Sequence, residues 1–229
     1  MRRGRVHFRA LAHAPGRPRF VARRTDARAA SGEHGRNASR PGSPYMIIQQ
    51  THRTSGPSFT LSNRVRRQLW NWVWLWLFRP SLRPMHAWRA ALLRLFGARL
   101  GRDARVYPAA RVWAPWNLVM GDHTAVADGV TLYNISPITL GDYAIVSQGS
   151  HLCTGSHDYN SETFQLIASP ITLERHVWVC AEAFISPGVT LPEGAVIAPR
   201  SVVTKPLREA WTVYGGTPAR PIGQRRPQA

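Results

Sequence analysis

The sequence predicts a parallel β-helix, a fold in which short strands wind around one core in stacked coils. Over residues 171–204 an aliphatic residue recurs at every sixth position, a period that neither a single helix nor a single strand produces. These positions are Leu173, Val179, Ile185, Leu191, Ile197 and Val203. The residue two positions before each of them is aliphatic or small. Six residues per strand and turn, with three faces closing a coil of about 18 residues, are typical of hexapeptide β-helices.

The same period extends upstream with small slips. It gives three further triplets, namely Leu100, Val106 and Val112; Met120, Val126 and Leu132; and Leu140, Val146 and Leu152. Equivalent positions there recur every 20 residues, which we interpret as an 18-residue coil with a two-residue bulge. We therefore expect about five coils between residues 99 and 206, stacked about 4.8 Å apart. Residues 207–229 are expected to form a C-terminal extension. Gly101, Gly121 and Gly141 each follow a stacked position, where a corner needs either a positive φ or a close approach of the backbone.

Residues 1–45 have a different composition from the rest of the chain. They hold eleven Arg, one Asp and one Glu, which is +9 of the total net charge of +18. They are rich in Gly, Pro, Ser and Ala and bury too little apolar surface to offset chain entropy, so we predict a disordered tail. Met46 is an alternative translation start. The charge raises the hypothesis of nucleic-acid binding, but the tail lacks the interleaved aromatic residues of single-strand binders, which argues against it.

Residues 60–98 are expected to form a helical segment. The pattern predicts a first helix from a cap at Ser62 or Asn63 to about Phe78, and a second helix over 85–96 that ends at Gly97. In the second helix, Trp88, Leu92 and Leu95 are predicted to share the apolar face and Arg89 to lie elsewhere. The first helix contains Trp70, Trp72, Trp74 and Trp76.

Two interpretations of this helical segment stay open. The favoured one is that the helices cover the open N-terminal end of the β-helix, where a strand edge would otherwise be exposed. The other is that residues 69–78, rich in Trp and flanked by Arg, contact a membrane surface. Their apolar run is too short to span a bilayer.

The six-residue period breaks between Leu152 and Leu173, so a loop over 153–172 is expected to leave the β-helix. A long loop on a rigid repeat scaffold is usually functional or disordered. This loop carries His157, whose imidazole is suited to taking a proton from a hydroxyl group near neutral pH. A surface histidine without a chemical role is the alternative.

The chain has two cysteines, Cys153 and Cys180, and each directly follows a stacked position. We expect small buried side chains and no disulfide framework. A nucleophilic Cys153 close to His157 is the alternative interpretation.

Four segments carry a resemblance to a known family. They are WRAALLRLFGARLG (88–101), LCTGSHDY (152–159), and SVVTK (201–205) with GGTPARPI (215–222). With the [LIV]-[GAED]-x-x-x-x repeat, they resemble the hexapeptide-repeat acetyltransferases of the colanic-acid-biosynthesis type, which are related to the galactoside and maltose acetyltransferases. The resemblance implies a left-handed β-helix and a homotrimer with active sites between neighbouring chains. It also implies transfer of acetyl from acetyl-CoA to a sugar hydroxyl.

The resemblance assigns roles to individual residues. His157 matches the catalytic base of the family. Trp178, Ala181, Thr204, Lys205 and Arg220 match positions that bind the coenzyme; the first two line the pantetheine and thioester channel, and Lys205 and Arg220 are cations for its phosphates. Lys205 is the only lysine in the chain. From the sequence we add Asn134 and Asp158 as candidate acceptor contacts, and Asp158 also as a group that orients His157. No metal is expected.

Two other classes are weighed against this one. A γ-carbonic-anhydrase-like metal hydratase needs three histidines on one zinc ion. His123 and His176 each lie three residues after a stacked position and so could share a face, but they are two coils apart. A non-catalytic β-helix scaffold is the second rival. The expected location is the cytoplasm, with membrane association left open.

Overall fold

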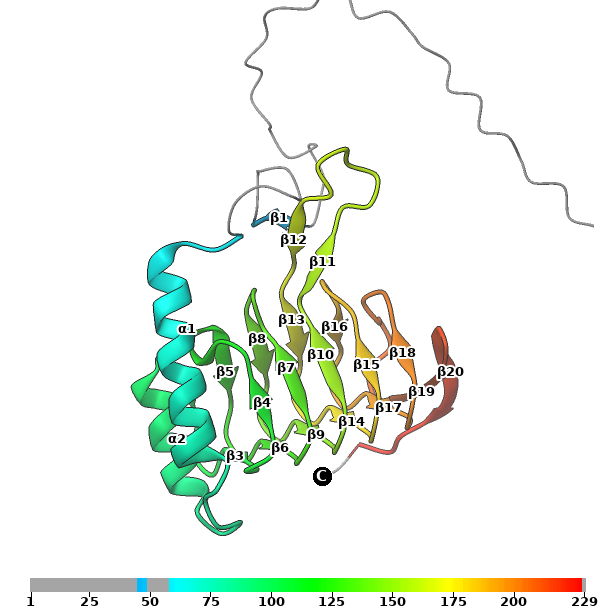
Figure 1. The fold of residues 1–229 in the computed structure, drawn as a ribbon. Helices are drawn as coiled ribbons and strands as arrows, with labels where there is room; N and C mark the ends of the chain where they lie inside the picture. Colours follow the sequence, from blue (N-terminus) through cyan, green and yellow to red (C-terminus); the bar gives the residue numbers. More distant parts are fainter. Residues whose placement is uncertain (1–44, 49–57, 228–229) are drawn as a thin grey trace, which may run out of the picture. The chain divides into compact units, whose positions relative to one another are not determined.

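The hexapeptide period closes into a β-helix with three parallel sheets in the computed structural model, which describes residues 45–48 and 58–227 (Figure 1). The first sheet contains β2 (Arg99–Leu100), β5 (Leu118–Met120), β8 (Ile138–Leu140), β13 (Ile171–Leu173) and β16 (Thr190–Leu191). The second contains β3 (Arg105–Val106), β6 (Ala125–Val126), β9 (Ile145–Val146), β14 (Trp178–Val179), β17 (Val196–Ile197), β19 (Thr212–Gly216) and β20 (Ala219–Gln224). The third contains β4 (Arg111–Val112), β7 (Thr131–Tyr133), β10 (His151–Cys153), β15 (Phe184–Ile185) and β18 (Val202–Val203). The predicted tail, the alternative start and the nucleic-acid question concern residues that lie almost wholly outside the described ones.

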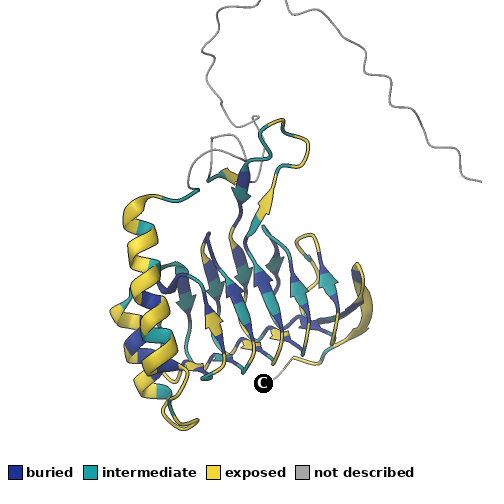
Figure 2. Cartoon of the chain, in the orientation of Figure 1, coloured by how far each residue is buried: buried dark blue, intermediate teal, exposed yellow. Residues whose placement is uncertain are grey.

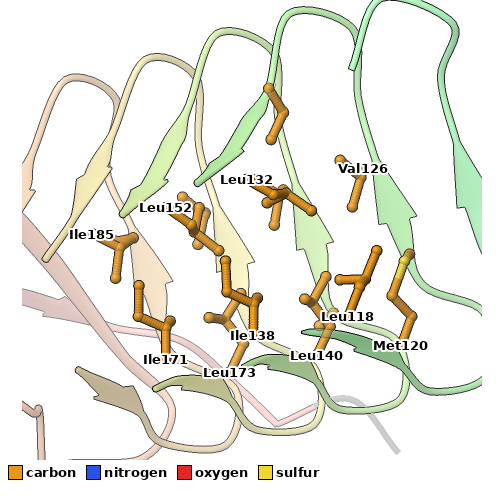
Figure 3. Close-up of a cluster of buried hydrophobic side chains, with 14 of the residues drawn as sticks. Leu118, Met120, Val126, Leu132, Ile138, Leu140, Leu152, Ile171, Leu173 and Ile185 are labelled. Atoms are coloured by element: carbon orange, nitrogen blue, oxygen red, sulfur yellow. The ribbon is translucent and has the colours of Figure 1, made fainter. Parts of the chain in front are cut away.

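The register of the strands confirms the predicted fold class. In the first sheet Met120 pairs with Leu140, Leu140 with Leu173, and Leu173 with Leu191. In Figure 3 the side chains of the stacked positions point into one continuous core, and those from Met120 to Val203 are at most 2% exposed. The β-helix has about six coils, close to the five expected, because β19 adds a further parallel strand beside β17. The stretch after residue 206, expected to be an extension, therefore continues the β-helix before β20 folds back antiparallel.

The glycines that follow stacked positions are explained by close approach and not by a positive φ. A Cβ on Gly141 would lie 2.8 Å from the backbone nitrogen of Arg175, and one on Gly121 would overlap the Asp142 carboxylate. The left-handed conformation occurs two residues later instead, at Asp103, His123 and Tyr143 and their equivalents. Each coil therefore turns its corner directly against the next one.

The helical cap consists of α1 (Leu61–Val73), a π-helical turn η1 (Trp74–Phe78) and α2 (His86–Leu95). The N-cap of α1 is Thr60, slightly before the expected position; its hydroxyl accepts a hydrogen bond from the Asn63 N–H at 3.4 Å. Gly97 follows the C-cap of α2 with a φ of +96°, as its predicted role requires. Among the described residues, no helix is long and apolar enough to cross a membrane.

The cap supplies a side-chain donor to each of the three strands at the N-terminal edge of the β-helix. Arg94 donates to the Leu100 carbonyl at 3.1 Å, on β2. Arg89 donates to the Val106 carbonyl at 2.6 Å, on β3. The Trp70 indole donates to the Val112 carbonyl at 2.7 Å, on β4. These edge carbonyls belong to stacked residues, so the cap both covers the end of the core and pairs its exposed edge.

The orientation of α2 differs from the prediction. Trp88 and Leu95 are 41% and 78% exposed, whereas Arg89 is fully buried with Leu92 and Leu93. The Arg89 guanidinium also donates to the carbonyls of Leu82 and Arg83, and to the Ser81 hydroxyl. Its burial is compensated by these acceptors, which apolar periodicity alone does not reveal.

The expected loop over 153–172 contains a β-hairpin. Its strands are β11 (Gly155–His157) and β12 (Leu166–Ala168), and β1 (Met46–Ile47) pairs antiparallel with β12 as a third strand. Figure 1 shows this small sheet projecting from the side of the β-helix. Ile135, Leu166 and Ala168 form an apolar cluster beneath it, against which Ile48, Phe59, Trp113 and Tyr133 pack. The short 3-10 helix η2 (Pro115–Asn117) leads into β5.

Candidate active site

His157 lies at the end of β11, with its side chain exposed to solvent. Its Nδ1 is 3.0 Å from the carbonyl oxygen of Phe164, on the far side of the hairpin loop. Its ring stacks on the Phe164 ring, with 4.6 Å between centroids and 9° between planes. A carbonyl oxygen can only accept a hydrogen bond, so this contact places the proton on Nδ1. The Nε2 lone pair is then available to take a proton from a ligand.

The base of the hairpin is anchored to the coil below it. The buried Thr154 hydroxyl donates to the Tyr133 carbonyl at 2.9 Å and accepts from the Ser136 N–H at 3.0 Å. Gly155 leaves no room for a side chain, because a Cβ there would meet Ile135 Cδ1 at 2.5 Å. The strand that carries His157 is thus held tightly two residues before the histidine.

Asp158 does not orient His157 in this structure. The Asp158 carboxylate accepts a hydrogen bond from the Asn160 N–H at 3.1 Å, which closes a turn within the loop. The backbone carbonyl of Phe164 holds the imidazole instead. Asp158 is the chain neighbour of His157, and its expected contact with the acceptor substrate stays a prediction.

Asn134 is not placed where it could contact the acceptor substrate. Its side chain is fully buried. The amide oxygen accepts from the Ala114 N–H at 2.9 Å and the amide nitrogen donates to the Ala114 carbonyl at 2.7 Å. The amide therefore substitutes for a backbone partner between adjacent coils. Its place at a bulge in the repeat explains this structural role, and the expectation of substrate contact was wrong.

The five candidate coenzyme residues lie on the outer surface of the last coils. Trp178 is 44% exposed on β14, and its indole N–H donates to the Ser147 hydroxyl at 2.9 Å. Ala181 is half-buried at the next corner. Thr204 and Lys205 are exposed just after β18, and Arg220 is exposed on β20. These two strands lie at the opposite end of the β-helix from the helical cap (Figure 1).

Among the described residues, no hydrogen bond or ion pair joins His157 to Lys205 or Arg220. The His157 side chain contacts Phe164, within its own hairpin. The Arg220 guanidinium donates to the neighbouring Ala219 carbonyl at 3.2 Å. The single chain therefore presents the candidate base and the candidate phosphate ligands as separate surfaces.

A cleft of about 760 Å³ lies beside Trp178 and was not predicted. Its wall is an aromatic column in which His123 stacks on Tyr143 and Tyr143 on His176, at 5.1 and 4.9 Å between centroids. Arg175 and Arg225 add positive charge to the lining. The sequence did place His123 and His176 on one face; Tyr143 between them separates the two imidazoles.

A second cleft, of about 350 Å³, lies between α1 and the outer face of β4 and β7. It combines aromatic rings, including Trp113 and Tyr133, with the polar groups of Arg67, Asn71 and Arg111. Tyr133 also borders the hairpin, since a Cβ on Gly155 would lie 3.1 Å from its ring. The sequence offered no signal for this cleft, because one wall comes from α1, which ends at Val73, and the other from β4, which begins only at Arg111.

The two rival chemistries have little support in the geometry. Burial raises the pKa of the Cys153 thiol, which opposes formation of a nucleophilic thiolate. Cys153 and Cys180 are both unpaired. Among residues 45–48 and 58–227, no three His, Cys, Asp or Glu side chains form a group suited to a metal ion.

The chain was compared with known proteins. No family model matches the chain. A protein of Escherichia coli K12, provisionally named as the colanic acid biosynthesis acetyltransferase WcaF, is 41% identical over 167 residues, which are 73% of this chain and 91% of that protein. The galactoside O-acetyltransferase of the same organism is 27% identical over 137 residues, 58% of this chain and 67% of the relative.

A solved structure extends the comparison to the fold and the coenzyme. The hexapeptide-repeat-containing acetyltransferase VCA0836 of Vibrio cholerae, in complex with acetyl-CoA, superposes with a TM-score of 0.66 at 26% identity. The alignment covers 76% of this chain and 94% of that one. The β-helix and these relatives define an acetyltransferase that uses acetyl-CoA as co-substrate. The chain belongs to the family of hexapeptide-repeat acetyltransferases that includes the colanic acid biosynthesis acetyltransferase.

Proposed function

We propose that this acetyltransferase moves the acetyl group of acetyl-CoA to a hydroxyl of a sugar or polysaccharide precursor, with His157 as general base. Nε2 of His157 takes the hydroxyl proton as the oxygen attacks the thioester carbonyl. The tetrahedral intermediate collapses with cleavage of the C–S bond, giving the O-acetyl ester. The proton held by His157 then passes to the CoA thiolate, so no covalent acetyl-enzyme is needed.

One observation carries this proposal. His157 is exposed at the end of a pinned strand, and its Nδ1 is fixed by the Phe164 carbonyl 3.0 Å away. This arrangement selects the tautomer with a free Nε2 lone pair, which is what a general base for a hydroxyl requires.

The cleft under α1 supports a saccharide as the acceptor. Arg67, Asn71 and Arg111 offer hydrogen-bond donors to hydroxyls, and Arg67 and Arg111 lie over the rings of Trp113 and Trp74. It borders the base of the hairpin that carries His157 through Tyr133. The names of two relatives, which refer to colanic acid and to a galactoside, favour the same class of acceptor. We therefore infer a role in the modification of an exopolysaccharide or its precursor.

We propose that the working unit is a homotrimer with its sites between chains. The separation of His157 from Lys205 and Arg220 within one chain supports this proposal, because a neighbouring chain could bring the two surfaces together. Lys205 and Arg220 would bind the phosphates of CoA, and Trp178 and Ala181 would line the path of its pantetheine arm. We also propose that the enzyme works in the cytoplasm.

The acceptor is tested by measuring thiol release from acetyl-CoA with a panel of free, nucleotide-linked and lipid-linked sugars. The proposal predicts release that depends on one class of sugar and an O-acetyl ester in the product by mass spectrometry. Trp113→Ala should raise the KM for that sugar and leave the KM for acetyl-CoA unchanged. Transfer to an amine, with no sugar hydroxyl in the panel modified, would contradict the proposal.

A further inference from the structure

The four alternating tryptophans of α1 and η1 divide between two opposite sides of the helix. Successive residues of an α-helix are about 100° apart, so residues four apart share a side and residues two apart lie nearly opposite. Trp70 and Trp74 face the β-helix, where their indole N–H groups donate to the carbonyls of Val112 and Ala110. Trp72 and Trp76 face outward and are 57% and 64% exposed.

The outward side of α1 is a continuous apolar stripe. It consists of Leu61, Val65, Leu69, Trp72 and Trp76, which follow each other at helical spacing and are each more than half exposed. Figure 2 shows most of the outward surface of α1 as exposed. Leu75, Leu77 and Leu82 extend the apolar surface toward the turn before α2. A stripe of this size on the side away from the core is costly in water unless it has a partner.

The charge around the stripe points to the nature of that partner. From residue 58 to 102 the chain has nine Arg and neither Asp nor Glu. Arg64 and Arg79 are exposed cations of the cap. Arg66 and Arg94 are also exposed but donate to backbone carbonyls, and Arg83 forms an ion pair with Asp128. Because the N-terminal 45 residues also carry a net charge of +9, neither that segment nor a second copy of the cap offers the negative charge that this face would complement.

We propose that the stripe docks on an anionic lipid bilayer, with Trp72 and Trp76 in the interface between headgroups and acyl chains. Tryptophan favours this depth because its ring is apolar and its N–H remains hydrogen-bonded. The arginines interact with lipid phosphates, each adding to an attraction that salt weakens. The helix lies along the surface, and the β-helix remains in water. This inference does not depend on the identity of the acceptor or on the role of His157.

The test is co-sedimentation of the full chain with vesicles of phosphatidylglycerol and phosphatidylcholine, and with vesicles of phosphatidylcholine alone. We expect binding to the anionic vesicles, little binding to the neutral ones, and weaker binding as salt is raised. The variant Trp72→Ser/Trp76→Ser should bind at least about tenfold more weakly, since it removes two interfacial anchors. The control Ile222→Ser makes a similar change on β20, at a residue as exposed as Trp76 (64%), and should bind like wild type.

Sedimentation velocity and thermal unfolding of the same variants separate the other outcomes. Both variants should unfold within a few degrees of wild type and keep its oligomeric mass. If the double variant binds vesicles like wild type, another part of the chain attaches it and the proposal fails. If the double variant loses oligomeric mass, the stripe is an interface between copies, which also overturns it. Equal wild-type binding to neutral and anionic vesicles would refute the role of the arginines.

Discussion

The Nδ1 atom of His157 lies 3.0 Å from the carbonyl oxygen of Phe164, and the two rings stack 4.6 Å apart. One residue thus fixes both the tautomer and the plane of the imidazole. Phe164 itself has a φ of +47°, so the loop turns its carbonyl toward the histidine through a conformation that L-residues seldom adopt. The proposed base is positioned by the hairpin loop and not by a carboxylate.

This relationship predicts that Phe164→Ala lowers kcat by about 10- to 100-fold, because the imidazole loses its stacking partner and shifts from its working position. The KM for acetyl-CoA should change little. In a His157→Ala background the same substitution should have no further effect, since the two residues act as one unit. Steady-state kinetics of the four proteins measures this coupling, and full additivity of the two losses would contradict it.

Lys205 and Arg220 are predicted to contribute to coenzyme binding and not to the chemical step. Lys205→Ala or Arg220→Ala should raise the KM for acetyl-CoA about tenfold, consistent with loss of one charge-assisted contact to phosphate. The kcat should stay near the wild-type value. Arg208→Ala removes another exposed cation of the same end of the chain and is the matched control. An equal rise in KM for Arg208→Ala would indicate a general charge effect instead of specific contacts.

Asn134→Ala should reduce stability without altering acceptor binding. The substitution leaves the N–H and carbonyl of Ala114 unpaired in a fully buried position, at a cost of about 1–3 kcal/mol. Urea denaturation would report this loss as a lower midpoint. A normal midpoint together with a raised acceptor KM would restore the role in substrate binding that the sequence suggested.

His86 makes the helical cap sensitive to acid. Its Nδ1 accepts from Arg89 at 3.0 Å, because an arginine can only donate. Burial, followed by the charges of Arg89 and Arg105, lowers the pKa of His86 below its ordinary value of 6.5. The unfolded chain therefore takes up a proton at a higher pH than the native protein does. The contribution of His86 is complete above pH 6.5 and is lost as the pH falls through the lowered native pKa.

The corresponding measurement is the melting temperature between neutral pH and about pH 5, where Tm should fall by roughly 2–4 °C for each kcal/mol lost. His86→Gln keeps an acceptor but cannot titrate, so its Tm should fall less steeply. Burial lowers the pKa of His151 as well, so some dependence should persist in the variant. Identical pH profiles for wild type and His86→Gln would exclude His86 as a cause of the loss of stability in acid.

The parts of the structure that depend on the six-residue period were predictable from the sequence. Each stacked residue pairs with its equivalents in the neighbouring coils, as Val126 pairs with Val146, so the period fixes the register. The break after Leu152 located the hairpin for the same reason. The pairing of β11 with β12, and of β12 with β1, was not predictable, because short strands outside the six-residue period have no sequence signal of their own.

The candidate site was predictable only where a residue type and a family motif coincided. His157 and Lys205 were proposed in this way, while Phe164 contacts His157 through its backbone carbonyl, which any residue type has. The burial of Arg89 and Asn134 depends on unpaired groups of neighbouring coils, which exist only once the fold has formed. The same limit applies to the cleft that joins Arg67 to Trp113 and Tyr133.

The most direct test of the central claim is acetyl transfer by His157→Ala and wild type with the best sugar acceptor, followed by thiol release at saturating acetyl-CoA. Loss of the general base should lower kcat by about 10²–10⁴-fold, while acetyl-CoA binding, measured by calorimetry, stays intact. A His157→Ala enzyme that binds acetyl-CoA and turns over within a few-fold of wild type would contradict the account and place the base elsewhere.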